Sequence, residues 1–158
     1  MMVLNRLVWS SYTRKTSHSE KGIGIKIEPE SGERILFFLT DSAESRASLG
    51  LSREQKACDA VVFFRGKKPN PIMLFSELKS CDFNHAIDQI RSTYEAVKKH
   101  FPDKSVFPNP KAIALIVAAK GSPPGNKVLE KRLNCPGVTL HVCSGCKGKT
   151  IDIRKYLT

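Results

Sequence analysis

The chain lacks several features that would place it in a special class of protein. No stretch of its 158 residues approaches the ~20 consecutive apolar residues that a membrane span needs. The opening apolar run is too short for a secretory signal. There is no internal repeat, no low-complexity tract and no linker long enough to separate domains. We therefore expect a soluble cytoplasmic protein with no membrane partner, in which residues 1–158 form one domain.

Acidic residues are also scarce. Asp and Glu number 15 against 26 Lys and Arg, which gives a formal net charge of +11. The imbalance is concentrated in residues 98–158, where 12 basic residues face only 3 acidic ones. An excess of this kind attracts polyanions through counterion release, and nucleic acid is the commonest such partner. We expect a nucleic-acid partner, with DNA favoured; the alternative is a basic surface that serves only solubility.

The five cysteines are too few and too unevenly spaced for a disulfide framework or a typical zinc site. Their number is odd and no secretory context accompanies them, so reduced thiols are expected. A structural zinc site takes four ligands, usually from two separated pairs. The chain has a single Cys-x-x-Cys pair, Cys143 and Cys146, with Cys135 and His141 nearby. This spacing argues against structural zinc at these four residues.

What the chain does contain is an alternation of apolar runs and turns that predicts an α/β fold with a mixed sheet. Helical spacing of apolar residues from Phe83 to Phe101 predicts a long helix, capped by Asp82 and stopped by Pro102. Residues 111–119 are apolar on both faces, as in a central strand. The other predicted elements are a hairpin over 22–40 with strands at 22–27 and 34–39, a short helix within 41–57, strands at 60–64 and 72–75, a helical turn or two at 126–133 and a last strand at 138–144.

Charged residues at the end of one apolar strand need an explanation. Glu77 and Lys79 are two residues apart, so a strand places them on one face. If residues 65–71 form the preceding loop, Asp59 lies opposite Glu77, with Cβ atoms ~5 Å apart. Two carboxylates at that distance repel each other unless a cation lies between them. The alternative is that Lys79 merely neutralises one of them in a salt bridge.

Asp59 followed by Glu77-Leu78-Lys79, between apolar strands and before a long helix, resembles the PD-(D/E)XK nuclease superfamily. The resemblance covers roughly residues 56–120. It implies a restriction-endonuclease-like core, in which a helix, three antiparallel strands, a second helix and a further strand follow one another. Cys58 stands where the motif often has Pro. Gln89 matches a glutamine on the helix of several branches, although its spacing to Tyr94 differs from the exonuclease-like ones, so the branch is not identified.

The resemblance implies a metal-dependent nuclease, an endonuclease in preference to an exonuclease. Asp59, Glu77 and the backbone carbonyl of Leu78 would bind Mg²⁺ or Mn²⁺, which prefer oxygen donors. Lys79 would orient or help to deprotonate the attacking water and offset phosphate charge. Gln89 would position water or phosphate, the alternative being a solvated helix side chain. Defence, repair and mobile-element processing are all compatible with this activity.

Five further residues complete the expected site. Glu20, ahead of the first predicted strand, is the best-placed candidate for an additional acidic metal ligand of the kind this superfamily often has. Lys67, Lys68, Lys147 and Lys149 are candidate contacts to the nucleic-acid backbone.

Two alternatives stay open. The first is a catalytically silent nucleic-acid-binding domain on the same fold. The second concerns targeting: a chain this small has little surface for reading a long sequence, because specific readout buries ~1,000 Å² or more. We therefore expect weak sequence preference, a homodimer or a partner protein that supplies targeting.

Overall fold

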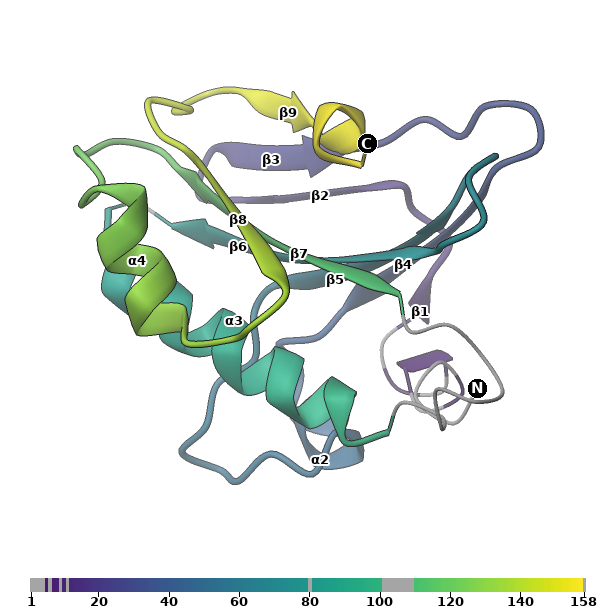
Figure 1. Ribbon diagram of the computed structural model, residues 1–158, viewed down its shortest axis with the longest axis horizontal. Coiled ribbons are helices and arrows are strands. Elements are labelled where there is room, and N and C mark those ends of the chain that lie inside the picture. The colour runs from purple at the N-terminus through teal and green to yellow at the C-terminus, as the bar shows by residue number, and fades with distance from the viewer. Residues whose placement is uncertain are drawn as a thin grey trace.

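The computed structural model describes residues 5, 7, 8, 10, 12–79, 81–100 and 110–157. In this part of the chain two sheets and a layer of helices are stacked on one another (Figure 1). The larger sheet has the order β1 (Tyr12–Thr13), β4 (Arg34–Leu39), β5 (Ala60–Arg65), β6 (Ile72–Lys79), β7 (Lys111–Ala118) and β8 (Val138–Cys143). The smaller sheet has the order β2 (Ser17–Glu20), β3 (Ile23–Lys26) and β9 (Thr150–Asp152). The helices are α2 (Ala43–Ser48), α3 (Phe83–Lys98) and α4 (Asn126–Leu133), with a 3₁₀ turn at Ile153–Tyr156.

The six-stranded sheet is mixed, which confirms the prediction of an α/β fold with a mixed sheet. β4, β5 and β6 are antiparallel neighbours, whereas β6, β7 and β8 run parallel. Phe64 pairs with Ile72 and Ala60 with Ser76, so the predicted β5–β6 register is confirmed. The parallel β6–β7 pair requires a crossover, which α3 provides. As a result the carboxyl ends of β6, β7 and β8 lie together at one end of the sheet.

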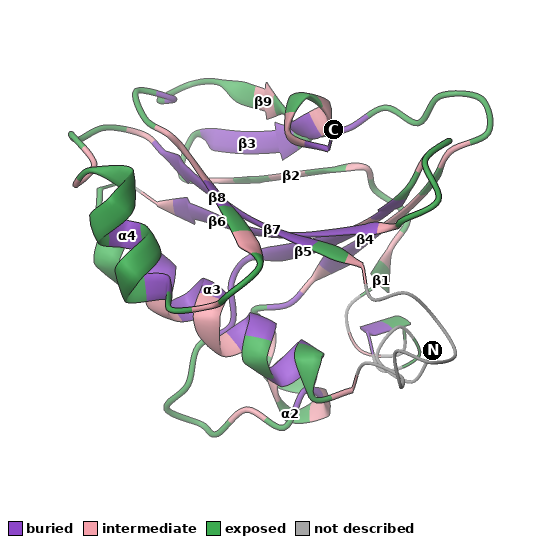
Figure 2. Cartoon of the chain, viewed as in Figure 1, coloured by how far each residue is buried: buried purple, intermediate pink, exposed green. Residues whose placement is uncertain are grey.

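Helix α3 covers one face of this sheet. The Asp82 side chain accepts a hydrogen bond from the backbone N–H of His85 (2.9 Å), so the predicted N-cap is confirmed. The side of the helix that faces the sheet is buried (Figure 2) and carries Phe83, Ala86, Ile87, Ile90, Tyr94 and Val97. The predicted end of the helix, Phe101 and Pro102, lies outside the described residues. The apolar stripe therefore does what its 3.6-residue period predicts: it buries one face of the helix.

Each face of the six-stranded sheet has its own hydrophobic core. Alternate residues of β6 serve the two faces: Met73 and Phe75 pack with the α3 core, while Leu74 and Leu78 pack with the core beneath β3 and β9. All residues of β7 after Lys111 are buried, which confirms the prediction of a central strand. The sheet is thus covered on both sides, and its strand ends are the places where polar side chains can gather.

The predicted hairpin over 22–40 is wrong. β3 pairs with β2 and β9, whereas β4 pairs with β1 and β5 in the other sheet. The β2–β3 turn is formed by Lys21 and Gly22, whose φ angles of 50° and 77° suit a tight hairpin turn. Strand β2 was missed because its residues, Ser17–Glu20, are all polar and only alternate ones are half-buried.

The strand predicted at 138–144 is not the last one. After β8 the chain forms β9, which pairs in parallel with β3, and then the 3₁₀ turn. Strand β9 has three residues, of which only Ile151 is apolar, so it carries no readable alternation. The short strand nevertheless matters, because it completes the smaller sheet that bears the β2–β3 turn.

Candidate functional site

Two carboxylates continue the β5–β6 pairing beyond its last backbone pair. Glu77 Oε2 accepts the N–H of Asp59 (3.0 Å), and Asp59 Oδ2 accepts the N–H of Leu78 (2.7 Å). Asp59 is 7 % exposed and Glu77 is 0 % exposed. Each side chain thus satisfies a backbone donor of the neighbouring strand. This reciprocal arrangement follows from the register, which places Asp59 directly across from Glu77.

Lys79 lies beside the carboxylate pair. Its Nζ is 2.7 Å from Glu77 Oε1, and its side chain is 20 % exposed. The predicted sharing of one strand face is therefore realised as a direct ion pair. In this arrangement the lysine offsets the charge of one buried carboxylate.

Glu20 is brought to the same end of the sheet from the smaller sheet. It ends β2, directly before the turn, and its carboxyl adds to the rise in the pKa of Asp59. Lys21, in the turn, forms an ion pair with Glu20 at 3.2 Å. The negative charges of Asp59 and Glu77 also attract its ammonium group and help to raise its pKa. Lys21 was not identified from the sequence as a residue near the site. The Lys21-Gly22 pair before the apolar strand was the signal that could have predicted a turn here. The role of Glu20 as a metal ligand stays a prediction.

Burial, together with neighbouring acids, raises two pKa values into the neutral range. Burial raises the pKa of Asp59 to about 7, with Glu20 adding to the rise and the Leu78 N–H and Lys79 opposing it. Burial and the Asp59 charge raise the pKa of Glu77 to about 8, against the attraction of Lys79. Without a cation, these two carboxyls therefore keep their protons to a higher pH than exposed carboxyls do.

The donor set fits a hard divalent cation, because it consists of oxygen atoms only. The N–H of Leu78 donates to Asp59, and binding of a metal by the Leu78 carbonyl stays a prediction. Within the described part of the chain, however, no group of three or more His, Cys, Asp or Glu side chains is arranged to hold a metal ion. Binding by Asp59 and Glu77 would require exchange of their present partners, so the metal stays a prediction.

Gln89 is buried rather than solvated. It is 4 % exposed, and its Nε2 donates to the carbonyl of Ala57 (3.0 Å). One turn later on α3, Thr93 Oγ1 accepts the N–H of Cys58 (2.8 Å) and donates to the Gln89 carbonyl. These two side chains therefore fix the segment that leads into Asp59. Contact of Gln89 with water or phosphate stays a prediction; its buried Oε1 has no partner among the described residues.

The four candidate backbone-contact lysines fall at two different ends of the molecule. Lys67 and Lys68 lie in the exposed β5–β6 loop, at the opposite end of the hairpin from Asp59. Lys147 and Lys149 lie in the exposed β8–β9 loop, whose backbone bonds to the ends of β7 and to the β2–β3 turn. Only the second pair shares an end of the sheet with the carboxylates.

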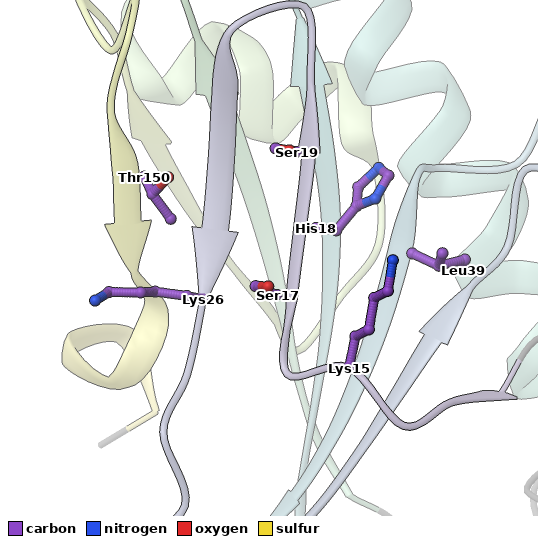
Figure 3. Close-up of a pocket in the computed structure, with 7 residues that line it drawn as sticks. All are labelled: Lys15, Ser17, His18, Ser19, Lys26, Leu39 and Thr150. Atoms are coloured by element: carbon purple, nitrogen blue, oxygen red, sulfur yellow. The ribbon is translucent and has the colours of Figure 1, made fainter.

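A pocket of about 450 Å³ runs along β2, the strand that ends at Glu20 (Figure 3). Lys15 and His18 lie on the side of β2 near Leu39, whereas Lys26 points away from them (Figure 3). Leu39 lines the pocket, and the N–H of Thr40, the next residue, donates to the Asp59 carbonyl (3.1 Å). The complete lining is Lys15, Ser17, His18, Ser19, Lys26, Leu39 and Thr150. Basic and hydroxyl groups of this kind suit an anionic ligand.

The cysteine and histidine residues considered for zinc do not converge. Cys143 and Cys146 have their Sγ atoms 2.9 Å apart, but Cys135 Sγ contacts the Leu133 carbonyl (3.2 Å). The His141 ring packs against Tyr156, with ring centroids 4.9 Å apart.

No protein-family model, no curated protein and no solved structure matches the chain. Among the described residues, no helix is long and apolar enough to cross a membrane.

Proposed function

We propose that the protein is a metal-dependent nuclease that hydrolyses phosphodiester bonds, with DNA as the favoured substrate. The observation that carries this proposal is the meeting of Asp59, Glu77 and Lys79 at one end of the sheet, with Glu20 beside them. Buried acids with pKa values near 7 and 8 are costly to a fold, which favours a chemical purpose for them.

The order of the elements supports the restriction-endonuclease-like interpretation. Three antiparallel strands, β4, β5 and β6, are followed by α3 and by the parallel strand β7. The resemblance expects this succession, although α2 lies between β4 and β5 instead of only ahead of the strands. The candidate site also lies at the carboxyl ends of parallel strands, where ligands of open α/β sheets bind.

The chain's own groups have distinct tasks in this proposal. A bound Mg²⁺ or Mn²⁺ would supply charge stabilisation for the phosphate and a more acidic water. Asp59 and Glu77 would hold it as carboxylates, together with the Leu78 carbonyl and, through its position, Glu20. Lys79, released from Glu77, would orient the attacking water and donate to a phosphate oxygen. The segment fixed by Gln89 keeps Asp59 in place.

Basic groups around the site support a polyanionic substrate. Lys21, Lys120, Lys147 and Lys149 are exposed and lie at or next to the strand ends that carry the acids. Lys15 and His18 line the pocket along β2. A phosphate backbone following the pocket would meet cationic side chains on either side of the acidic cluster.

The test is cleavage by the full chain. Supercoiled plasmid, single-stranded DNA and RNA are each incubated with protein and Mg²⁺, Mn²⁺ or a chelator. We expect plasmid cleavage with metal only, and its loss in Lys79→Ala. Lys99→Ala is the matched control: it removes the same charge from an exposed lysine beyond the far end of α3, and it should cleave as the wild type does.

The catalytically silent alternative is favoured by one observation: the oxygen atoms of Glu77 already have partners in the Asp59 N–H and Lys79. If the cluster is closed in this way, the protein binds DNA but cleaves none of the three substrates with either metal. Equal cleavage by wild type and Lys79→Ala would instead indicate a contaminating nuclease and would count against the proposal.

A further inference from the structure

The two cysteines of the β8–β9 loop lie within reach of a covalent bond. Cys143 ends β8 and is half-buried, while Cys146, three residues later, is 2 % exposed. Their Sγ atoms are 2.9 Å apart. A disulfide has an S–S distance of ~2.05 Å, so the two atoms need to approach by only about 0.9 Å. We propose that Cys143 and Cys146 form a reversible disulfide, with a low-molecular-weight disulfide such as oxidised glutathione as the oxidant.

The two thiols differ in a way that orders the exchange. Cys143 is the more accessible, so its thiolate attacks one sulfur of glutathione disulfide, and the S–S bond of that molecule breaks to release one glutathione thiolate. The Cys146 thiolate then attacks the Cys143 sulfur and releases the second. The protein loses two electrons and two protons, and one glutathione disulfide becomes two glutathione thiols. In the reduced protein, burial and the neighbouring Cys143 raise the pKa of Cys146 to about 11, so Cys146 is a poor first nucleophile.

A metal is a poorer explanation of this pair than a disulfide. Structural zinc takes four ligands. The nearest further candidates face elsewhere, since His141 packs on Tyr156 and Cys135 contacts the Leu133 carbonyl. Across the ranges that the structure describes, no third His, Cys, Asp or Glu joins the two thiols.

The loop that carries the pair is bonded to the end of β7. The N–H of Cys146 donates to the Ala118 carbonyl (3.0 Å), and that of Lys147 donates to the Ala119 carbonyl (3.2 Å). Ala119 in turn donates its N–H to the carbonyl of Lys79 (2.9 Å). The dithiol is therefore one strand away from the candidate site.

The same loop is bonded to the β2–β3 turn, to the left in Figure 1. The N–H of Gly148 donates to the Gly22 carbonyl (2.7 Å), and that of Gly24 donates to the Lys149 carbonyl (3.0 Å). This turn follows Glu20. A disulfide restrains the loop, so these bonds open less often and the turn is held more firmly against the site.

The experiment equilibrates the full chain with glutathione mixtures of increasing oxidising strength, alkylates the remaining thiols and records the intact mass and the peptide map. We expect one two-electron step that joins Cys143 to Cys146. Cys143→Ser and Cys146→Ser should abolish the step, the latter leaving a mixed disulfide on Cys143. Cys81→Ser is the matched control, since it removes an exposed thiol on another loop and should retain the step.

Hydrogen exchange reads out the effect on the fold without any assay of cleavage. Peptides that contain Gly24 and Gly148 should exchange at least ~3-fold more slowly in the oxidised protein, because loop opening is what exposes these amides. The Cys143→Ser protein should show no such difference. Position 143 is only half-buried, so the serine should be tolerated by the fold. Stoichiometric zinc in the purified protein, a different cysteine pairing, or no bond at the most oxidising mixture would overturn the proposal; unchanged exchange on oxidation would overturn the coupling to the turn. None of these readouts depends on the nuclease proposal.

Discussion

Two ion pairs in this molecule have the same length, but the pKa values of their carboxyl groups shift in opposite directions. Lys79 Nζ lies 2.7 Å from Glu77, and an Arg154 guanidinium nitrogen lies 2.7 Å from Glu33. The hydrogen bond from Arg154 lowers the pKa of Glu33, whereas burial raises the pKa of Glu77 to about 8 in spite of Lys79. The distance between the partners therefore does not decide the protonation state; solvent and a second carboxylate do.

The two pairs also differ in what they hold together. Arg154 binds Glu33, Glu30 and the Glu28 carbonyl, so it fastens the C-terminal 3₁₀ turn to the connection between the two sheets. Glu77 and Lys79 are two residues apart on one strand, and outside the pair Glu77 holds only the N–H of Asp59 on the neighbouring strand. The first pair has a structural task, and the second keeps charged groups at a site that could otherwise be apolar. The predictions below test this difference.

The largest expected effect is on catalysis by Glu77→Gln. The amide keeps the shape of the side chain but lacks the charge needed to hold a cation, so cleavage should fall at least ~100-fold, or about 2.7 kcal/mol in activation free energy. Glu33→Gln removes the same charge from the other pair and should cleave as the wild type does. Initial rates of plasmid nicking at saturating Mg²⁺ measure both. Equal losses in the two variants would show that net charge, not the site, is responsible.

The next effect is on the pH dependence of stability without metal. Asp59 and Glu77 have ordinary pKa values near 4 when unfolded, and about 7 and 8 in the folded protein. The folded state thus binds more protons between pH 4 and 8, and the free energy of unfolding should fall as pH rises through this window. Urea unfolding at pH 5 and pH 8 measures this loss of stability.

Two controls isolate the groups behind that slope. Asp59→Asn and Glu77→Gln should each flatten it, because each removes one ionisable group with a raised pKa. Glu33→Gln should leave it in place, since the pKa of Glu33 is lowered and its contribution to stability is lost only on acidification. A slope of the same size in Asp59→Asn would mean that other groups cause it. Added Mg²⁺ should raise stability most at pH 8.

The third effect concerns the support of the site. Gln89→Leu leaves the Ala57 carbonyl buried without its donor, at a cost of about 1–3 kcal/mol in the free energy of unfolding. The chain offers a matched control in Gln55→Leu, an exposed glutamine whose side chain caps the N–H of Ser52. Its cost should be smaller, because water replaces the lost bond. Urea unfolding of both proteins measures the difference, and an equal cost would count against a supporting role for Gln89.

Some of the site could be predicted from the sequence because its geometry is local. The β5–β6 loop and two apolar runs were enough to place Asp59 opposite Glu77, and the spacing of apolar residues was enough to place α3. The contact between Gln89 and Ala57 spans 32 positions, and no periodicity encodes it. The hairpin that carries Glu20 and Lys21 was mispaired, because its polar strand β2 shows no apolar alternation. What failed was the pairing of a polar strand, which depends on packing between the two sheets and not on apolar alternation.

The smallest expected effect is on the melting temperature, when the Arg154–Glu33 pair is changed. Arg154→Lys keeps the charge but loses the fork that reaches Glu33 through two nitrogens and the Glu28 carbonyl through one of them. We expect a small drop in melting temperature that shrinks in 1 M NaCl, because the Arg154 end of this part-buried pair is open to solvent and its ions. The drop should be smaller than that of Gln89→Leu, and cleavage should not change. A larger drop that does not depend on salt would contradict this ranking. It would mean that the Arg154–Glu33 pair contributes more to the stability of the fold than the buried groups at the site do.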